Sequence, residues 1–107
     1  MKRYGMVIKV RKGKLPRYKK LHAAVWPGVL KMIKACKIRN YSIFYKDGFL
    51  FSYFEYHGRN FGKDMAKMAA DPLTQEWWAE CKPCQQPLRT RKKGEWWAEM
   101  EEVFYLK

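Results

Sequence analysis

A tyrosine, a histidine and a tryptophan recur at four-residue intervals, as Tyr18, His22 and Trp26, in a strongly basic chain of 107 residues. On an α-helix, residues four apart lie on the same side, so these three side chains would share one face. Imidazole titrates near neutral pH, with an unperturbed pKa of about 6.5, and a phenol one helical turn away can orient it or share a proton transfer. The stripe is therefore either an irregular part of the core or the lining of a pocket suited to acid–base chemistry. The other histidine, His57, stands beside Gly58 in a predicted turn and is expected to be structural or exposed.

Tryptophan occurs twice as an adjacent pair, at 77–78 and at 96–97. Adjacent residues on a helix point about 100° apart, so Trp77 and Trp78 cannot both face the core in the same way. An indole face stacks well on the C–H faces of a sugar, and the indole N–H can donate to a hydroxyl group. The first pair is thus interpreted as one packed and one pocket-lining tryptophan, with two packed tryptophans as the alternative.

The rest of the chain predicts the elements that position these residues. Runs of β-branched and aromatic residues bounded by turn residues predict strands over 4–10, 41–45, 49–56 and 100–106. Helical spacing of apolar residues predicts helices over 16–36, 60–70 and 72–81. The order β-α-β-β-α-β, with the first α interrupted and the second in two parts, is the ferredoxin-like pattern of an α+β fold.

Three local signals mark where these elements begin, end or turn. Pro27 is expected to kink the first helix or to split it near Trp26. Asp47-Gly48 between two aromatic runs predicts a β-hairpin. Asp71-Pro72 predicts a helix start, with aspartate as the N-cap and proline at the first helical position.

The bulk composition indicates one folded domain, residues 1–107. Apolar residues make up 48% of the chain and aromatic residues 17%, which excludes a disordered chain. No apolar run is long enough for a membrane span, and the apolar part of the N-terminus is too short for a secretory signal. The three cysteines, Cys36, Cys81 and Cys84, are too few and odd in number for a disulfide framework. We therefore expect a cytoplasmic protein without membrane partners.

The net charge of +13 is unevenly distributed, because residues 1–46 carry 14 lysines and arginines and no acidic residue. Such a surface raises the hypothesis of nucleic-acid or other anion binding, against the simpler interpretation of a solvated basic face. RNA-recognition domains share the strand order predicted here. The run DGFLFSYF, over 47–54, lacks their glycine- and valine-containing signature, so sheet-core aromatics are the favoured interpretation and no specific nucleic-acid partner is expected.

The motif CKPC, from Cys81 to Cys84, has the spacing of a thiol redox pair. In redox proteins such a motif opens a helix, whose N-terminus lowers the thiol pKa, but here it closes one. No second cysteine pair completes a zinc site. Neither redox chemistry nor a metal site is therefore predicted.

Five segments, taken together and in this order, resemble the L-rhamnose mutarotase family, small dimeric α/β sugar epimerases, over nearly the whole length of the chain. They are Y-x-x-x-H-x-x-x-W-P at 18–27, NYSIF at 40–44, LFSYFEY at 50–56, DMAKMAADPLTQEWW at 64–78 and EWWAEMEEVFYL at 95–106. The resemblance implies a ferredoxin-like subunit that dimerises into an α/β barrel, with the C-terminal segment reaching across to the partner. Two features depart from the family: Gly28 stands where an acidic residue is common, and the net charge is unusually positive.

The resemblance also implies roles for individual residues. His22 corresponds to the proton donor, and the sugar-contacting positions correspond to Tyr18, Tyr41, Trp77 and Trp78. We expect Trp26 and Asn40 to support this pocket. Interconversion of two pyranose anomers needs only proton transfers at the ring oxygen and the anomeric hydroxyl, so no metal or cofactor is expected.

The sequence therefore predicts a homodimeric mutarotase for L-rhamnose or a related 6-deoxyhexose. Two alternatives stay open. One is a non-enzymatic ferredoxin-like module that binds RNA or another anion through its basic N-terminal half. The other is a related dimeric barrel that oxidises or binds a small aromatic molecule.

Overall fold

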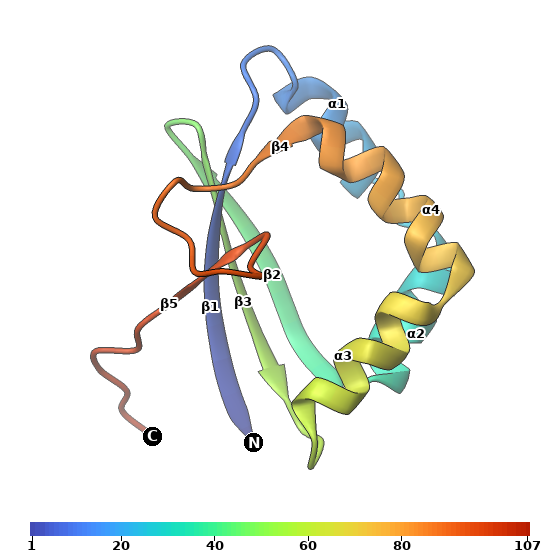
Figure 1. Ribbon diagram of the computed structural model, residues 1–107, viewed down its shortest axis with the longest axis vertical. Coiled ribbons are helices and arrows are strands. Elements are labelled where there is room, and N and C mark those ends of the chain that lie inside the picture. Colours follow the sequence, from blue (N-terminus) through green and yellow to red (C-terminus); the bar gives the residue numbers. More distant parts are fainter.

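A computed structural model describes residues 1–107 as a mixed α+β fold, in which helices cover one face of a curled antiparallel sheet (Figure 1). The strands are β1 (Lys2–Val10), β2 (Ile38–Lys46), β3 (Phe49–Tyr56), β4 (Gln85–Gln86) and β5 (Ala98–Met100). The helices are α1 (Leu15–His22), α2 (Pro27–Ala35), α3 (Phe61–Ala70) and α4 (Pro72–Cys81), followed by a short 3₁₀ turn, η1 (Lys82–Cys84). None of these helices has the length and apolar character needed to cross a membrane.

The sheet has the order β2-β3-β1-β4, and β5 pairs with the same edge of β1 as β4 does. Tyr4 lies opposite Phe54, and Ile8 lies opposite Leu50, in the central antiparallel pair. The predicted ferredoxin-like order is confirmed. The hairpin at Asp47-Gly48 is confirmed as well, and both residues have the positive φ angles, 49° and 88°, that favour a tight two-residue turn.

Pro27 splits the first predicted helix into two, as the sequence predicts. Trp26 has an extended backbone, with φ −60° and ψ 132°, and is the N-cap of α2, where Pro27 takes the first helical position. Trp26 is therefore not a continuation of the α1 face that carries Tyr18 and His22. Gly28 then lies so close to the Leu73 side chain of α4 that a Cβ there would come within 2.3 Å of Leu73 Cδ2.

Side-chain caps begin the next two helices. Asn60 Oδ1 accepts a hydrogen bond from Lys63 N at 3.0 Å at the start of α3. Asp71 Oδ2 accepts one from Thr74 N at 3.1 Å at the start of α4, so the predicted Asp-Pro helix start is confirmed.

The core lies between the helices and the concave face of the sheet. Because successive residues of a strand alternate between faces, Leu50, Ser52, Phe54 and Tyr56 of β3 are buried while their neighbours are less so. The opposite face of the sheet, called the outer sheet face, points away from the helices. It also carries aromatic side chains, of which Phe44 of β2 is 64% exposed.

The predicted last strand, 100–106, is wrong in its position. The strand β5 ends at Met100, which lies opposite Gly5, and residues 101–107 have no regular secondary structure. Beyond this point, side-chain contacts with Arg3 replace the backbone ladder. The Arg3 guanidinium donates to the Glu102 carboxylate at 2.8 and 3.0 Å. It also lies 3.3 Å from the centre of the Tyr105 ring. Residues 82–94, which lie outside every predicted helix and strand, contain η1 and the short strand β4.

Candidate active site

A row of aromatic side chains joins α1 to α4. The Tyr18 and His22 rings are stacked with centroids 4.1 Å apart, and the His22 ring meets Trp77 edge-on at 5.3 Å. Trp26 in turn contacts Trp77 edge-on at 5.2 Å. The structure thus brings together four of the predicted site residues, and Trp26 reaches the row through Trp77 instead of through its helical spacing from His22.

The tautomer of His22 follows from its hydrogen bond. Its Nδ1 lies 2.9 Å from the backbone oxygen of Tyr18. A carbonyl oxygen can only accept, so Nδ1 carries the hydrogen and Nε2 has a free lone pair. Burial lowers the pKa of His22, while the hydrogen bond to Tyr18 opposes that effect. The imidazole is therefore neutral at pH 7, with Nε2 ready to take up a proton.

Tyr18, unlike Nε2 of His22, carries a proton on its polar atom. Its residue is only 4% exposed, and burial raises the pKa of its hydroxyl, with the hydrogen bond from Gln85 as an opposing effect. The phenol keeps its hydrogen over the whole physiological range. A proton donor and a proton acceptor thus stand on adjacent turns of one helix, with their rings in contact.

Tyr41 reaches the same interior from the sheet by way of a β-bulge. Arg39 pairs with Glu55 and Ser42 with Tyr53, so the two residues between them, Asn40 and Tyr41, lie opposite Phe54 alone. The Tyr41 ring meets the Phe54 ring at 5.6 Å, on the face of β3 that points to the helices.

The hydroxyl of Tyr41 lies inside this concave region. Burial raises its pKa to about 12, although the residue as a whole is 43% exposed. The accessible surface is the direct measure of exposure, so part of the Tyr41 side chain is open to solvent. Tyr41 also contributes to the raised pKa of Tyr18, after the larger effect of burial.

Asn40 does not lie beside Tyr18 and His22. Its backbone has a φ of 51°, and its side chain donates to Glu55 Oε1 at 2.8 Å. Asparagine tolerates this left-handed conformation better than most residues do. Asn40 lies in the bulge directly before Tyr41 and outside the row.

The two adjacent tryptophans of α4 differ in burial. Trp77 is 6% exposed and belongs to a core cluster with Val29 and Cys81. Trp78 is partly exposed and packs against two core clusters, with Lys82 Nζ 5.7 Å from its ring. Trp78 is thus the one with free surface.

Gln85 and Trp96 are not among the site residues that the sequence predicts, but they are linked to Tyr18 by hydrogen bonds. Gln85 Nε2 lies 3.4 Å from the Tyr18 hydroxyl, and Trp96 Nε1 donates to Gln85 Oε1 at 2.8 Å. The second tryptophan pair, at 96–97, was the only signal for these contacts, because a single glutamine between the predicted elements carries none.

The remaining motifs lie elsewhere or have unreactive surroundings. His57 is exposed, and its Nε2 lies 3.3 Å from Glu55 Oε1. Cys81 and Cys84 are free, buried thiols, and burial raises the pKa of Cys81 to about 12, which disfavours the reactive thiolate. No three His, Cys, Asp or Glu side chains gather in a geometry for a metal ion.

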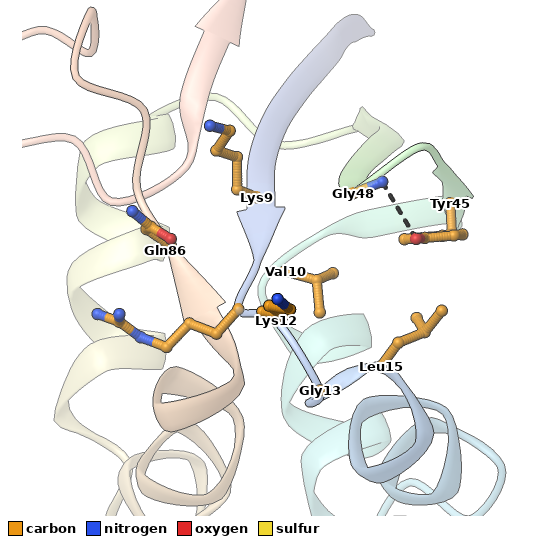
Figure 2. A pocket seen from close by; sticks show the side chains of 9 residues that line it. Lys9, Val10, Lys12, Gly13, Leu15, Tyr45, Gly48 and Gln86 are labelled. Carbon is orange, nitrogen blue, oxygen red and sulfur yellow. Dashed lines mark hydrogen bonds between the residues drawn. The ribbon is translucent and has the colours of Figure 1, made fainter.

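A separate basic cleft of about 460 Å³ opens between the end of β1, the β1–α1 turn and the β2–β3 hairpin (Figure 2). Lys9, Arg11 and Lys12 line it, and the backbone N–H of Gly48 donates to the Tyr45 hydroxyl at its rim. None of the predicted site residues lines this cleft.

The solved structures most informative for the fold cover essentially the whole chain. An L-rhamnose mutarotase from Formosa agariphila matches with a TM-score of 0.80 at 24% identity, over 100% of both chains. A tetracenomycin F2 cyclase from Streptomyces glaucescens matches with a TM-score of 0.75 at 12% identity, over 100% of this chain and 98% of that one. These likenesses define the class: a ferredoxin-like α+β fold that carries different chemistries.

The sequence comparisons decide the family within that class. The family model of L-rhamnose mutarotase matches residues 3–106. The L-rhamnose mutarotases of Shouchella clausii and Bacillus subtilis are each 32% identical to this chain, over 99% of both sequences in each case. The chain belongs to the L-rhamnose mutarotase family, and it is thus an isomerase of the mutarotase type.

Proposed function

We propose that this chain interconverts the α and β anomers of L-rhamnose by acid–base opening and closing of the pyranose ring, without a cofactor. The names of its relatives support the sugar. The observation that carries the mechanism is the stacked pair of Tyr18, which is a neutral phenol, and His22, whose Nε2 lone pair is free.

Ring opening uses both groups at once. His22 Nε2 accepts the proton of the anomeric hydroxyl, the C1=O bond forms, and the bond between C1 and the ring oxygen breaks. The ring oxygen takes the proton of the Tyr18 hydroxyl. After rotation about the C1–C2 bond, the ring oxygen attacks the other face of C1 and returns its proton to Tyr18. The His22 imidazolium then donates its proton to the new anomeric oxygen, and this step is the donor role expected from the family resemblance.

The other predicted site residues bind the sugar in this scheme. Tyr41 supplies a hydroxyl from the sheet side of the interior, and Trp78 supplies partly exposed indole surface from α4. Trp77 holds His22 in place by its edge contact, and Trp26 holds Trp77. Asn40 fixes the bulge from which Tyr41 projects.

We also propose a homodimer, located in the cytoplasm. The aromatic outer sheet face and the apolar C-terminal segment are the surfaces that a second copy would cover. In Figure 1 that segment leaves β5 on the side of the sheet away from the helices. Three free cysteines agree with a reducing compartment.

Saturation-transfer NMR of L-rhamnose tests the catalytic proposal. The unmodified protein should accelerate exchange between the α and β anomer signals, and His22→Ala should lose about 10²–10⁴-fold of that acceleration, the usual value of general acid–base assistance. His57→Ala is the matched control, because His57 pairs with Glu55 away from the row. An active but thermally unstable His22→Ala protein would mean that the histidine is structural.

A further inference from the structure

Gln85 is a buried amide in direct contact with the proposed acid. It is the first residue of β4, where it pairs with Val10, and it is 4% exposed. Its Nε2 lies 3.4 Å from the hydroxyl of Tyr18, which comes from a helix 67 positions earlier in the chain. A glutamine is seldom fully buried unless its polar atoms have partners.

Trp96 decides which way the Gln85 amide points. An indole N–H can only donate, and it lies 2.8 Å from Gln85 Oε1. The oxygen of the amide is therefore the atom on the Trp96 side, and the NH₂ group faces Tyr18. Without such a donor, the two ends of the amide could exchange places.

The orientation of the amide fixes the orientation of the phenol. Since Gln85 Nε2 donates to the Tyr18 oxygen, that oxygen accepts, and its own hydrogen must point elsewhere. No protein group accepts a hydrogen bond from the Tyr18 hydroxyl in the structure. The hydrogen therefore has no acceptor within the protein.

We propose that Gln85, oriented by Trp96, is the positioning residue that makes Tyr18 a directed proton donor. This inference rests on the proposed role of Tyr18 in ring opening. As the Tyr18 O–H bond breaks and the proton passes to the ring oxygen of the sugar, negative charge develops on the phenol oxygen. The Gln85 N–H already points at that atom, and hydrogen bonds to a charged acceptor are stronger than those to a neutral one. Gln85 keeps its own protons throughout.

Gln85→Met tests the proposal, because it keeps the length of the side chain and removes the amide. We expect kcat for anomer exchange to fall about tenfold, the value of one hydrogen bond to a developing charge, with KM nearly unchanged. Gln86→Met is the matched control, since Gln86 is the neighbouring residue of the same strand but is exposed and lies in the basic cleft. It should leave both constants unchanged.

Trp96→Phe tests the orienting contact separately, at a partly buried position that is safer for folding. It removes the N–H but keeps an aromatic ring, so kcat should fall by a few-fold with the melting temperature largely retained. Unchanged kcat in folded Gln85→Met and Trp96→Phe would overturn the proposal.

A double mutant shows whether Gln85 acts through Tyr18. In a Tyr18→Phe background, Gln85→Met should have no further effect on kcat. A full further loss there would also overturn the inference.

If Tyr18→Phe alone exchanges anomers at the normal rate, the proposed role of Tyr18 fails. If Tyr18→Phe is slow and Gln85→Met is not, only the role of Gln85 fails.

Discussion

At the scale of single residues, the protonation state of His22 leads to a prediction about pH. Its pKa is lowered from the ordinary 6.5 by burial, and the free Nε2 acts as a base only when the ring is neutral. The rate of anomer exchange should therefore stay high as pH falls through 6.5 and decline only below it, when the imidazole becomes protonated. A rate profile over about pH 4 to 8, measured by saturation transfer, checks this. A decline that begins well above pH 6.5 would contradict it.

The same shift has a consequence for stability. Because the folded pKa of His22 lies below the unfolded value, the unfolded chain binds more protons between the two. The stability that the neutral His22 ring contributes to the folded state is fully present above pH 6.5 and is lost as the pH falls through the folded pKa. Thermal unfolding of His22→Ala should show a weaker loss of stability over that window than the unmodified protein.

The two adjacent tryptophans should respond differently to truncation. Trp77 is 6% exposed within a core cluster, so Trp77→Ala should lower the free energy of unfolding by about 3–5 kcal/mol. Trp78 is partly exposed, so Trp78→Ala should be less destabilising and should chiefly raise the Kd for L-rhamnose through lost stacking area. Denaturant unfolding and sugar titration on both variants separate these effects. Equal destabilisation by both substitutions would be evidence against a free indole face at Trp78.

At the scale of secondary-structure elements, the bulge in β2 offers a test of how the sheet places Tyr41. Asn40 has a φ of 51°, which glycine adopts freely and a β-branched residue does not. Asn40→Val should lower stability by about 1–3 kcal/mol and slow anomer exchange, because the bulge and Tyr41 shift. Asn40→Gly loses the bond to Glu55 but keeps the backbone, so exchange should be near normal. Melting temperatures and anomer-exchange rates of the two variants test this role of the bulge. An active, stable Asn40→Val protein would contradict it.

Most of the fold follows from local signals in the chain. The break at Pro27, the hairpin at Asp47-Gly48 and the helix start at Asp71 each depend on a backbone preference that a few residues determine. The C-terminal strand was misplaced for a physical reason. The segment MEEVFYL has the same composition whether it pairs with a strand of its own chain or leaves the sheet. Here Arg3 binds Glu102 and Tyr105 in place of the backbone ladder.

Less of the candidate site could be predicted from local signals in the sequence. Tyr18 and His22 share a helix face, so their spacing predicts their contact. Trp26 also meets the row, but through Trp77 of another helix. The contact of Gln85 with Tyr18 joins residues 67 positions apart, and no periodicity in the sequence encodes it.

At the scale of the whole molecule, the charge predicts a weak attraction to polyanions. Of the 14 basic residues in 1–46, ion pairs engage only Arg3, Arg17 and Lys46. Binding to an RNA oligonucleotide should be detectable at low salt, should fall steeply as salt rises, and should not depend on sequence. Fluorescence anisotropy at several salt concentrations, with a scrambled oligonucleotide as control, measures this. Tight, sequence-selective binding at physiological salt would favour the nucleic-acid alternative.

The last prediction concerns the outer face of the sheet. Phe44 is 64% exposed there, and Phe104 in the C-terminal segment is 78% exposed. Apolar surface of this kind seldom stays in water, and a stable interface needs about 800 Å² from each partner. Light scattering at micromolar concentration should therefore report a dimer. Phe44→Glu and Phe104→Glu should each shift it toward the monomer without unfolding the chain, because both side chains are exposed within a single copy. Leu30→Glu is the matched control, since Leu30 is an exposed apolar residue of α2, on the helical side of the fold. If the unmodified chain is a folded monomer at that concentration, or if Leu30→Glu dissociates it as readily as Phe44→Glu does, the outer sheet face is not the dimer interface.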